Sequence, residues 1–258
     1  MKTEKKYILI SALSLSTAVF IWWLCTDVLK LAPGTVLPSP VKVLSTFIKK
    51  LYDSAPDGAT LIEHIGSSLN VAMTGYALGL IIGIPLGILM AWYDKVDMYV
   101  RPIFDLIRPI PGIAWVPFTI LFFGIGIMSK ASVVFLSAFV SCVINAYSGI
   151  RQTKSVHVWV GQTFGASKFE ILWRVGIPSA LPMILTGMRV ALASAWTAIV
   201  AAELLASTRG LGFMIQQSRG IYRPDVIIAG MLAIGGIGSI LTYLISLLEK
   251  RLLKGGRW

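Results

Sequence analysis

Few residues of this chain have the types and spacing that catalysis requires. Its histidines are His64 and His157, and its cysteines are Cys25 and Cys142. The sequence has no HExxH, GxSxG or CxxC motif, so it lacks the usual patterns of a zinc hydrolase, a serine hydrolase and a redox or metal pair. We therefore predict no catalytic residue and no metal site. We interpret both histidines as solvated polar side chains at helix ends. We interpret both cysteines as small apolar side chains that fill space between helices.

The composition places the chain in the membrane class. Hydrophobic residues make up 56% of it, charged residues only 14%, and the mean hydropathy is +0.78. A net charge of +11 is also typical of proteins that bind nucleic acid. However, the basic residues cluster in short connections between apolar runs, where they set membrane topology. We expect the lipid bilayer as a partner and no nucleic acid.

Long uncharged runs predict an all-α, polytopic membrane protein. A membrane-spanning helix needs roughly 20 apolar residues. Five runs meet this requirement and a sixth does so with Arg189 and Glu203 near its ends; they cover residues 7–26, 65–93, 109–129, 131–150, 182–205 and 226–248. The first run also resembles a signal peptide. It is long and no small-x-small cleavage site follows it, so we interpret it as a retained membrane helix.

Basic residues predict the orientation of these six spans. Six spans place both termini on one side, and that side receives 13 of the 23 lysines and arginines. The opposite side receives eight, and Arg108 and Arg189 lie within spans. Because basic residues favour the cytoplasm, we expect both termini to be cytoplasmic. Residues 27–64 then form an external connection whose amphipathic part, 41–52, lies along the outer surface, while 94–101 and 124–130 are short turns.

Glycines and prolines mark two of the spans. Glycines recur every four residues along the second span, at Gly75, Gly79, Gly83 and Gly87. This spacing predicts a helix face that packs closely within the subunit or against a second copy, although glycine is also generally enriched in membrane helices. Pro85 is expected to kink the same helix. Pro109, Pro111 and Pro117 are expected to break the third span, and broken membrane helices commonly line a cavity.

The polar segment 161–178 interrupts the apolar pattern on the cytoplasmic side. We predict a short helix over 153–164, a break at Gly165, and a second helix that starts at a Ser167/Glu170 capping box. Pro178 and Pro182 are expected to end the second helix. This helix-turn-helix would present Phe164, Phe169, Leu172 and Trp173 as apolar contacts. The alternative is an amphipathic loop that lies on lipid headgroups.

The segment resembles the cytoplasmic coupling loop, or EAA loop, of type I ABC importer permeases. In that family Glu-Ala-Ala is followed after three residues by glycine and after nine more by Ile-x-Leu-Pro. Here the glycine is Gly165, the closing element is Val175 to Pro178, and Trp159 replaces the glutamate. Because this carboxylate is missing, the resemblance implies that the loop binds the ATPase through shape complementarity and apolar contacts. The resemblance assigns the ATPase-coupling loop to Trp159, Gly161, Gly165, Ala166, Ser167, Phe169, Ile177 and Pro178.

The resemblance extends over roughly residues 35–250. Residues 106–117, 123–130 and 201–214 are similar to permeases for nitrate, sulfonate and taurine, and the last block is most similar to the taurine branch. The resemblance implies an N-terminal helix and external segment over 1–64, the permease domain over 65–250 and a basic cytoplasmic tail over 251–258. It implies import of a small anionic solute, taurine or another sulfonate; nitrate, bicarbonate and a thiamine-precursor pyrimidine are alternatives.

The family implies an assembly in the bacterial cell membrane. It would contain two copies of this permease, a cytoplasmic ABC ATPase dimer and an extracytoplasmic solute-binding protein. The chain has no Gly-x-x-x-x-Gly-Lys-Ser/Thr loop, so it has no cofactor of its own, and ATP and Mg²⁺ would bind in the partner ATPase. A passive channel is also compatible with six spans but gives the cytoplasmic helix-turn-helix no role. An intramembrane enzyme is a further alternative, but the sequence lacks the catalytic residues that such an enzyme needs.

An anionic solute requires a few hydrogen-bond donors in an apolar pathway. The pathway candidates are Arg108, Asn145, Trp196, Thr197 and Glu203. Arg108 has a structural alternative, an ion pair with Asp105 three residues earlier. Glu203 has one as well, a salt bridge with Arg209 in place of a gate.

Overall fold

A computed structural model describes residues 2–31 and 33–254, and the described residues form helices and loops without a strand. Helix α1 (Lys2–Trp23) continues into a π turn (Leu24–Val28). The other helices are α2 (Pro40–Lys50), α3 (Leu61–Trp92), α4 (Asp94–Ile107), α5 (Val116–Phe123), α6 (Ile127–Arg151), α7 (Ser155–Thr163), α8 (Lys168–Ile171), α9 (Ile177–Leu205), α10 (Leu211–Gly220) and α11 (Pro224–Lys254). The predicted basic tail lies partly in α11, and residues 255–258 lie outside the described residues.

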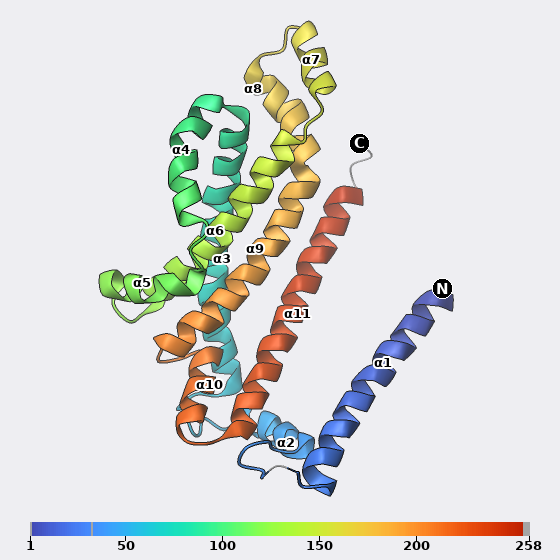
Figure 1. The fold of residues 1–258 in the computed structure, drawn as a ribbon, viewed down its shortest axis with the longest axis vertical. Coiled ribbons are helices and arrows are strands. Elements are labelled where there is room, and N and C mark those ends of the chain that lie inside the picture. The colour runs from blue at the N-terminus through green and yellow to red at the C-terminus, as the bar shows by residue number, and fades with distance from the viewer. Residues whose placement is uncertain (1, 32, 255–258) are drawn as a thin grey trace.

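Five of these helical segments are long and apolar enough to cross a membrane, and α4 with the segment Gly112–Phe123 forms a sixth candidate that is bent by 87°. This confirms the predicted all-α, polytopic class. Figure 1 shows α3, α6 and α9 side by side, with α7 and α8 at one end and α2 and α10 at the other. We call these the α7/α8 end and the α2/α10 end.

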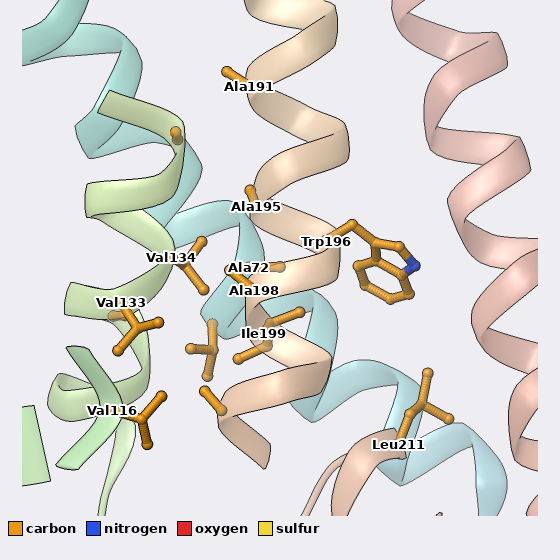
Figure 2. Packing of buried hydrophobic residues seen from close by; sticks show 14 of the residues in the cluster. Ala72, Val116, Val133, Val134, Ala191, Ala195, Trp196, Ala198, Ile199 and Leu211 are labelled. Atoms are coloured by element: carbon orange, nitrogen blue, oxygen red, sulfur yellow. The ribbon is translucent and has the colours of Figure 1, made fainter. Parts of the chain in front are cut away.

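The centre of the bundle consists of small side chains. Ala72 from α3, Ala138 from α6 and Ala195 from α9 are completely buried in one cluster with Val133, Val134 and Ile199. Figure 2 shows Ala72, Ala195, Val133, Val134 and Ile199 between the three helices. Small residues let helix backbones approach closely, and in lipid such close packing replaces the hydrophobic driving force that operates in water.

The glycine face of α3 packs against α6 of the same chain. A Cβ atom built on Gly75 would lie 2.7 Å from the Ala131 carbonyl oxygen, and one on Gly87 would lie 2.6 Å from the Val143 carbonyl oxygen. Gly79 and Gly83 meet Ala138 and Cys142 in the same way. Each glycine therefore occupies a position at which two backbones are too close for a larger residue.

The break predicted in the third span is confirmed at Pro109 and Pro111, whereas the predicted turn over 94–101 is wrong. Residues 94–107 form α4, which packs against α3, and the chain then breaks before the 3-10 turn Gly112–Trp115 and α5. Pro109 and Pro111 explain the break because neither supplies a backbone N–H and each disfavours helix in the residue before it. Pro117 is tolerated because it lies in the first turn of α5.

The prediction that Pro178 and Pro182 end the second cytoplasmic helix is wrong. After α8 the chain passes through a π turn (Leu172–Gly176) directly into α9, so the helical segment runs from Lys168 to Leu205. Pro178 lies in the first turn of α9, where the missing N–H is tolerated, and the wider π turn precedes it. Pro182 lies inside α9, and neighbouring helices in a membrane protein can accommodate such an interruption.

Candidate functional site

A cleft of about 620 Å³ lies where the broken segment after α4 meets α6 and α9. The segment contributes Arg108 and Trp115, α6 contributes Ser137, and α9 contributes Ser194 and Thr197. The rest of the lining is Ile107, Ile110, Pro111, Gly112, Ile113, Leu136, Val140, Ala193, Ala198 and Ala201. The cleft therefore combines one guanidinium and three hydroxyl groups with an otherwise largely apolar wall, and its volume suits a small ligand.

Gly112 brings the broken segment against α6. A Cβ atom at this position would lie 2.1 Å from Ser137 Oγ, so the segment contacts the helix by its bare backbone. The proline break and this close approach together place the segment along one side of the cleft. The sequence predicted the broken segment as a pathway wall, and the structure places it at the wall of this cleft.

The hydroxyl groups in the cleft already have partners within the chain, two of them backbone carbonyl groups. Ser137 Oγ donates to the Val133 carbonyl oxygen at 3.0 Å, and Thr197 Oγ1 donates to the Ala193 carbonyl oxygen at 3.0 Å. Ser194 Oγ lies 3.4 Å from Ser141 Oγ. A hydroxyl group of this kind can donate to a passing anion only by giving up its bond to the helix. The cleft is thus suited to weak, transient contacts.

Arg108 lines the cleft and also forms the ion pair that the sequence left open. Its Nη1 atom lies 3.4 Å from Asp105 Oδ1, and about half of each side chain is exposed. An exposed pair of this length is weak. The guanidinium can therefore exchange its partner for another anion at low cost.

Three of the five pathway candidates do not line this cleft. Trp196 projects from the opposite side of α9 and donates from Nε1 to the Ile234 carbonyl oxygen of α11 at 3.1 Å; Figure 2 shows its indole turned toward α11. Asn145 donates to the Ser141 carbonyl oxygen at 2.8 Å and packs against Gly187. Trp196 does not line this cleft because neighbouring residues of a helix point about 100° apart, and the cleft lies on the side of Thr197.

Glu203 is buried in a polar network at the α2/α10 end. Its carboxylate accepts hydrogen bonds from Ser68 Oγ at 2.8 Å and from the Gly212 backbone N–H at 3.0 Å, and its side chain is 1% exposed. Ser68 Oγ in turn accepts from the Leu211 backbone N–H at 2.9 Å. The predicted pair with Arg209 is wrong, because Arg209 lies 4.0 Å from Glu63 instead. Glu203 thus fixes the turn between α9 and α10.

His64 continues this network, so its interpretation as a solvated residue is wrong. It is completely buried, and its Nδ1 atom accepts a hydrogen bond from the Gly210 backbone N–H at 3.1 Å. Its Nε2 atom lies 3.4 Å from Asp57 Oδ2. His64 occupies the first turn of α3, and the helix face it shares with Leu61 and Ser68 points into the protein.

A buried lysine joins α2 to the same region. Lys50 Nζ is paired with Asp57 and also donates to the Ala59 carbonyl oxygen at 2.8 Å. Burial alone would raise the pKa of Asp57, but the contacts with His64 and Lys50 outweigh burial and hold that pKa below its usual value. The sequence carries no local signal of this network because its hydrogen-bonded partners are up to 146 residues apart along the chain.

The predicted helix, glycine turn and second helix are present at the α7/α8 end. Gly165 has a φ of +76°, and the bonds from Gly165 N–H to the Gln162 carbonyl and from Ala166 N–H to the Gly161 carbonyl form a Schellman motif at the end of α7. Ser167 and Glu170 form the predicted capping box, with the Ser167 N–H donating to Glu170 Oε2 at 2.8 Å. The turn therefore has a defined geometry.

Exposed apolar side chains cover this α7/α8 end. Phe164 is 87% exposed and Trp159 is 61% exposed, and Phe169 packs edge-on against Trp173 with both rings more than half exposed. The exception is Leu172, which is 4% exposed and belongs to the interior, so its prediction as an apolar contact is wrong. We call the exposed residues Val156, Trp159, Val160, Phe164, Phe169 and Trp173 the apolar cap.

Trp92 connects the segment between α7 and α9 to α3. Its Nε1 atom donates to the Lys168 carbonyl oxygen at 3.2 Å, and its ring lies against Gly176. Gly161 in α7 packs in the same way against Ile171. Ile177 and Pro178 then begin α9, so the loop is attached directly to two helices of the central bundle. Among the described residues no group of three His, Cys, Asp or Glu side chains has the geometry of a metal site.

Comparison with known proteins assigns the family. Residues 83–255 match the family described as "Binding-protein-dependent transport system inner membrane component". The taurine transport system permease protein TauC of Escherichia coli (strain K12) is 36% identical, over 93% of this chain and 86% of that protein. The nitrate import permease protein NrtB of Synechocystis sp. is 30% identical, over 92% of this chain and 86% of that protein.

A solved structure shows the same fold. A chain of the MetNI methionine ABC transporter in an inward-facing conformation has a TM-score of 0.65 and 21% identity, over 76% of this chain and 95% of that chain. At this identity the likeness concerns the fold alone. Together with the family match and the relatives, it shows that this chain is a multi-pass membrane protein of the binding-protein-dependent transport family, the permease subunit of an ABC importer for small solutes and not an enzyme.

Proposed function

We propose that this permease imports taurine or another small sulfonate, and that the solute passes through the cleft beside the broken segment. The similarity to the taurine permease supports the substrate class. The observation that carries the proposal is the composition of the cleft, in which Arg108 and three hydroxyl groups are set in a mostly apolar wall. A sulfonate needs a cation and a few donors, and it must also be released.

The cleft is expected to bind the solute weakly. Arg108 is paired with Asp105, and Ser137 and Thr197 already donate to backbone carbonyl groups, so an arriving anion must replace these interactions. Each gain is offset by a loss, which keeps the net affinity low. Selection would then depend mainly on a separate solute-binding protein that delivers its ligand to the α2/α10 end.

The apolar cap is the proposed docking surface for the ATPase. A soluble partner that buries Phe164 and Trp159 would remove a large exposed apolar area from water. Movement of the segment around Gly165 would reach the bundle through Trp92 and through the continuous helix into α9. ATP and Mg²⁺ would bind in that ATPase. Two copies of the permease would form one pathway, with both termini and the cap in the cytoplasm.

Uptake of radiolabelled solutes into proteoliposomes tests the proposal. The permease, its ATPase and its binding protein would be reconstituted and offered taurine, other sulfonates, nitrate, bicarbonate and a pyrimidine. We expect ATP-dependent uptake of a sulfonate, and R108Q should lower the uptake rate by about tenfold, the effect of losing a hydrogen bond to a charged group. The matched control is R209Q, which removes an exposed arginine outside the cleft.

Uptake of a different solute class would contradict the sulfonate assignment. Nitrate is the second candidate, favoured by the similarity to the nitrate permease and by the same anion-suited cleft. Import of nitrate through this cleft would also require Arg108. Import of a neutral pyrimidine, with R108Q and R209Q equally active, would refute the role of the cleft arginine.

A further inference from the structure

Helix α2 lies between the ends of two candidate membrane spans, α1 and α11. It packs against α11, and Thr46 Oγ1 donates to Asp225 Oδ2 in the first turn of α11 at 2.8 Å. On its other side Trp22 Nε1 at the end of α1 donates to the Pro38 carbonyl oxygen at 3.1 Å. Figure 1 shows α2 across the space between the ends of α1 and α11.

Large parts of these two spans are not covered by the rest of the chain. In their most apolar windows, 0% of the α1 span and 6% of the α11 span are buried within the chain. Both spans end where α2 contacts them, so α2 lies at the level where a membrane helix leaves the hydrocarbon core. The same level holds the aromatic residues Trp22, Trp23 and the exposed Tyr52, which is typical of a membrane–water interface.

The sequence of α2 divides its surface into three faces. Successive residues of a helix are about 100° apart, so the residues of each face project together and the face centres are roughly 120° apart. The first face consists of Val43, Thr46, Phe47 and Lys50, and it packs against the protein. An ordinary amphipathic surface helix has only one apolar face and one polar face.

The second face of α2 is apolar but exposed. It consists of Val41, Leu44 and Ile48, whose side chains are 64%, 60% and 51% exposed. The third face consists of Lys42, Ser45 and Lys49, all exposed, and Lys49 lies 3.5 Å from Asp53. An apolar strip beside a basic strip at a membrane interface matches a phospholipid, which offers acyl chains next to a phosphate.

We propose that α2 is an interfacial lipid-binding helix, with Val41, Leu44 and Ile48 in the acyl region of the adjacent leaflet and Lys42 and Lys49 at its phosphates. Lysine ammonium groups at helix surfaces extend toward the headgroups while their stems cover apolar surface. The inference depends on the membrane location of the chain and not on the identity of its solute.

Spin-label accessibility measures the environment of each face. Single cysteines at positions 41, 44 and 48 and at positions 42, 45 and 49 would be labelled in a background without Cys25 and Cys142, and the permease would be reconstituted in phospholipid vesicles. All six positions are exposed, so the labels should not disturb packing. We expect collisions with oxygen to dominate at 41, 44 and 48, and collisions with a water-soluble nickel complex to be several-fold more frequent at 42, 45 and 49.

Three outcomes would overturn the proposal. Equal access of the nickel complex to both sets would place the apolar face in water. Low access of both reagents at 41, 44 and 48 would show that a second copy of the chain covers this face. Loss of nickel access at these positions only when the binding protein is added would assign the face to that protein. Labels at 62 and 66 of α3, exposed positions on a helix that crosses the membrane, provide the reference.

Discussion

Replacement of Gly79 by alanine tests how α3 packs on α6. The new Cβ atom would lie 2.6 Å from Ala138 Cβ and 3.0 Å from the Phe139 backbone nitrogen. Carbon atoms pack at about 3.5–4.0 Å, so the two helices would have to separate by roughly 1 Å. Because these neighbours are backbone or attached directly to it, no rotamer change relieves the contact. Overpacking of this kind costs about 1–3 kcal/mol.

Gly66 in the same helix provides the matched control. It is exposed, and nothing lies within 4 Å of a Cβ atom built there. Alanine at this position adds helix propensity worth up to about 1 kcal/mol. The same chemical change is therefore expected to lower the free energy of unfolding at Gly79 and to leave it unchanged or raise it at Gly66.

Unfolding in mixed detergent micelles, followed by circular dichroism, measures both variants. A third variant exchanges the sizes across the contact, with Gly79→Ala combined with Ala138→Gly. This removes the shortest contact, so it should recover part of the lost stability, although the contact with Phe139 remains. The reasoning is refuted if Gly79→Ala is as harmless as Gly66→Ala, or if the exchange recovers nothing.

Three further predictions concern the α7/α8 end and the buried network. Gly165→Val forces a branched residue to a φ of +76°, which costs about 1–3 kcal/mol of backbone strain. This variant should reduce solute uptake while ATP hydrolysis continues. Gly165→Asn is the control because asparagine tolerates this conformation. Trp92→Phe removes the bond to the Lys168 carbonyl, about 1 kcal/mol, and should speed hydrogen exchange in residues 165–172 but not in α3. The lowered pKa of Asp57 means that its contribution to stability is present above about pH 4 and is lost as the pH falls through that lowered pKa. Asp57→Asn should remove this pH dependence in thermal unfolding. Because Lys50 stays buried without its partner, the substitution should also lower the free energy of unfolding by about 3–5 kcal/mol at neutral pH.

The sequence was informative where structure depends on local signals. Gly165 and the Ser167/Glu170 capping box act over a few residues, and the structure contains both. Long apolar runs predicted α3, α6 and α11 because length and hydropathy are sufficient for a membrane helix. The prolines around residue 110 predicted a break. They did not predict that α4 would form before the break. The charged residues Asp94 and Arg101 made this segment resemble a polar turn, although it forms a helix that packs against α3.

The candidate site was less predictable because it depends on which side chains meet across the bundle. Thr197 lines the cleft and Trp196 does not, although the two are adjacent in sequence. Ser68 carries no local signal of the buried carboxylate that it contacts 135 residues later. His64 lies near a helix end, where solvent is the usual environment, but here the end of α3 is covered by Asp57 and the turn before α10.

ATP dependence of solute uptake distinguishes an ATP-driven permease from a passive channel. Proteoliposomes would contain this permease with its ATPase and binding protein, and uptake would be measured with ATP, without ATP and without the ATPase subunit. The permease function predicts uptake only when both ATP and the ATPase are present, and loss of ATPase docking when Phe164 and Phe169 of the apolar cap are replaced by glutamate. Uptake that proceeds without ATP and without the ATPase would contradict the account and identify the chain as a passive channel.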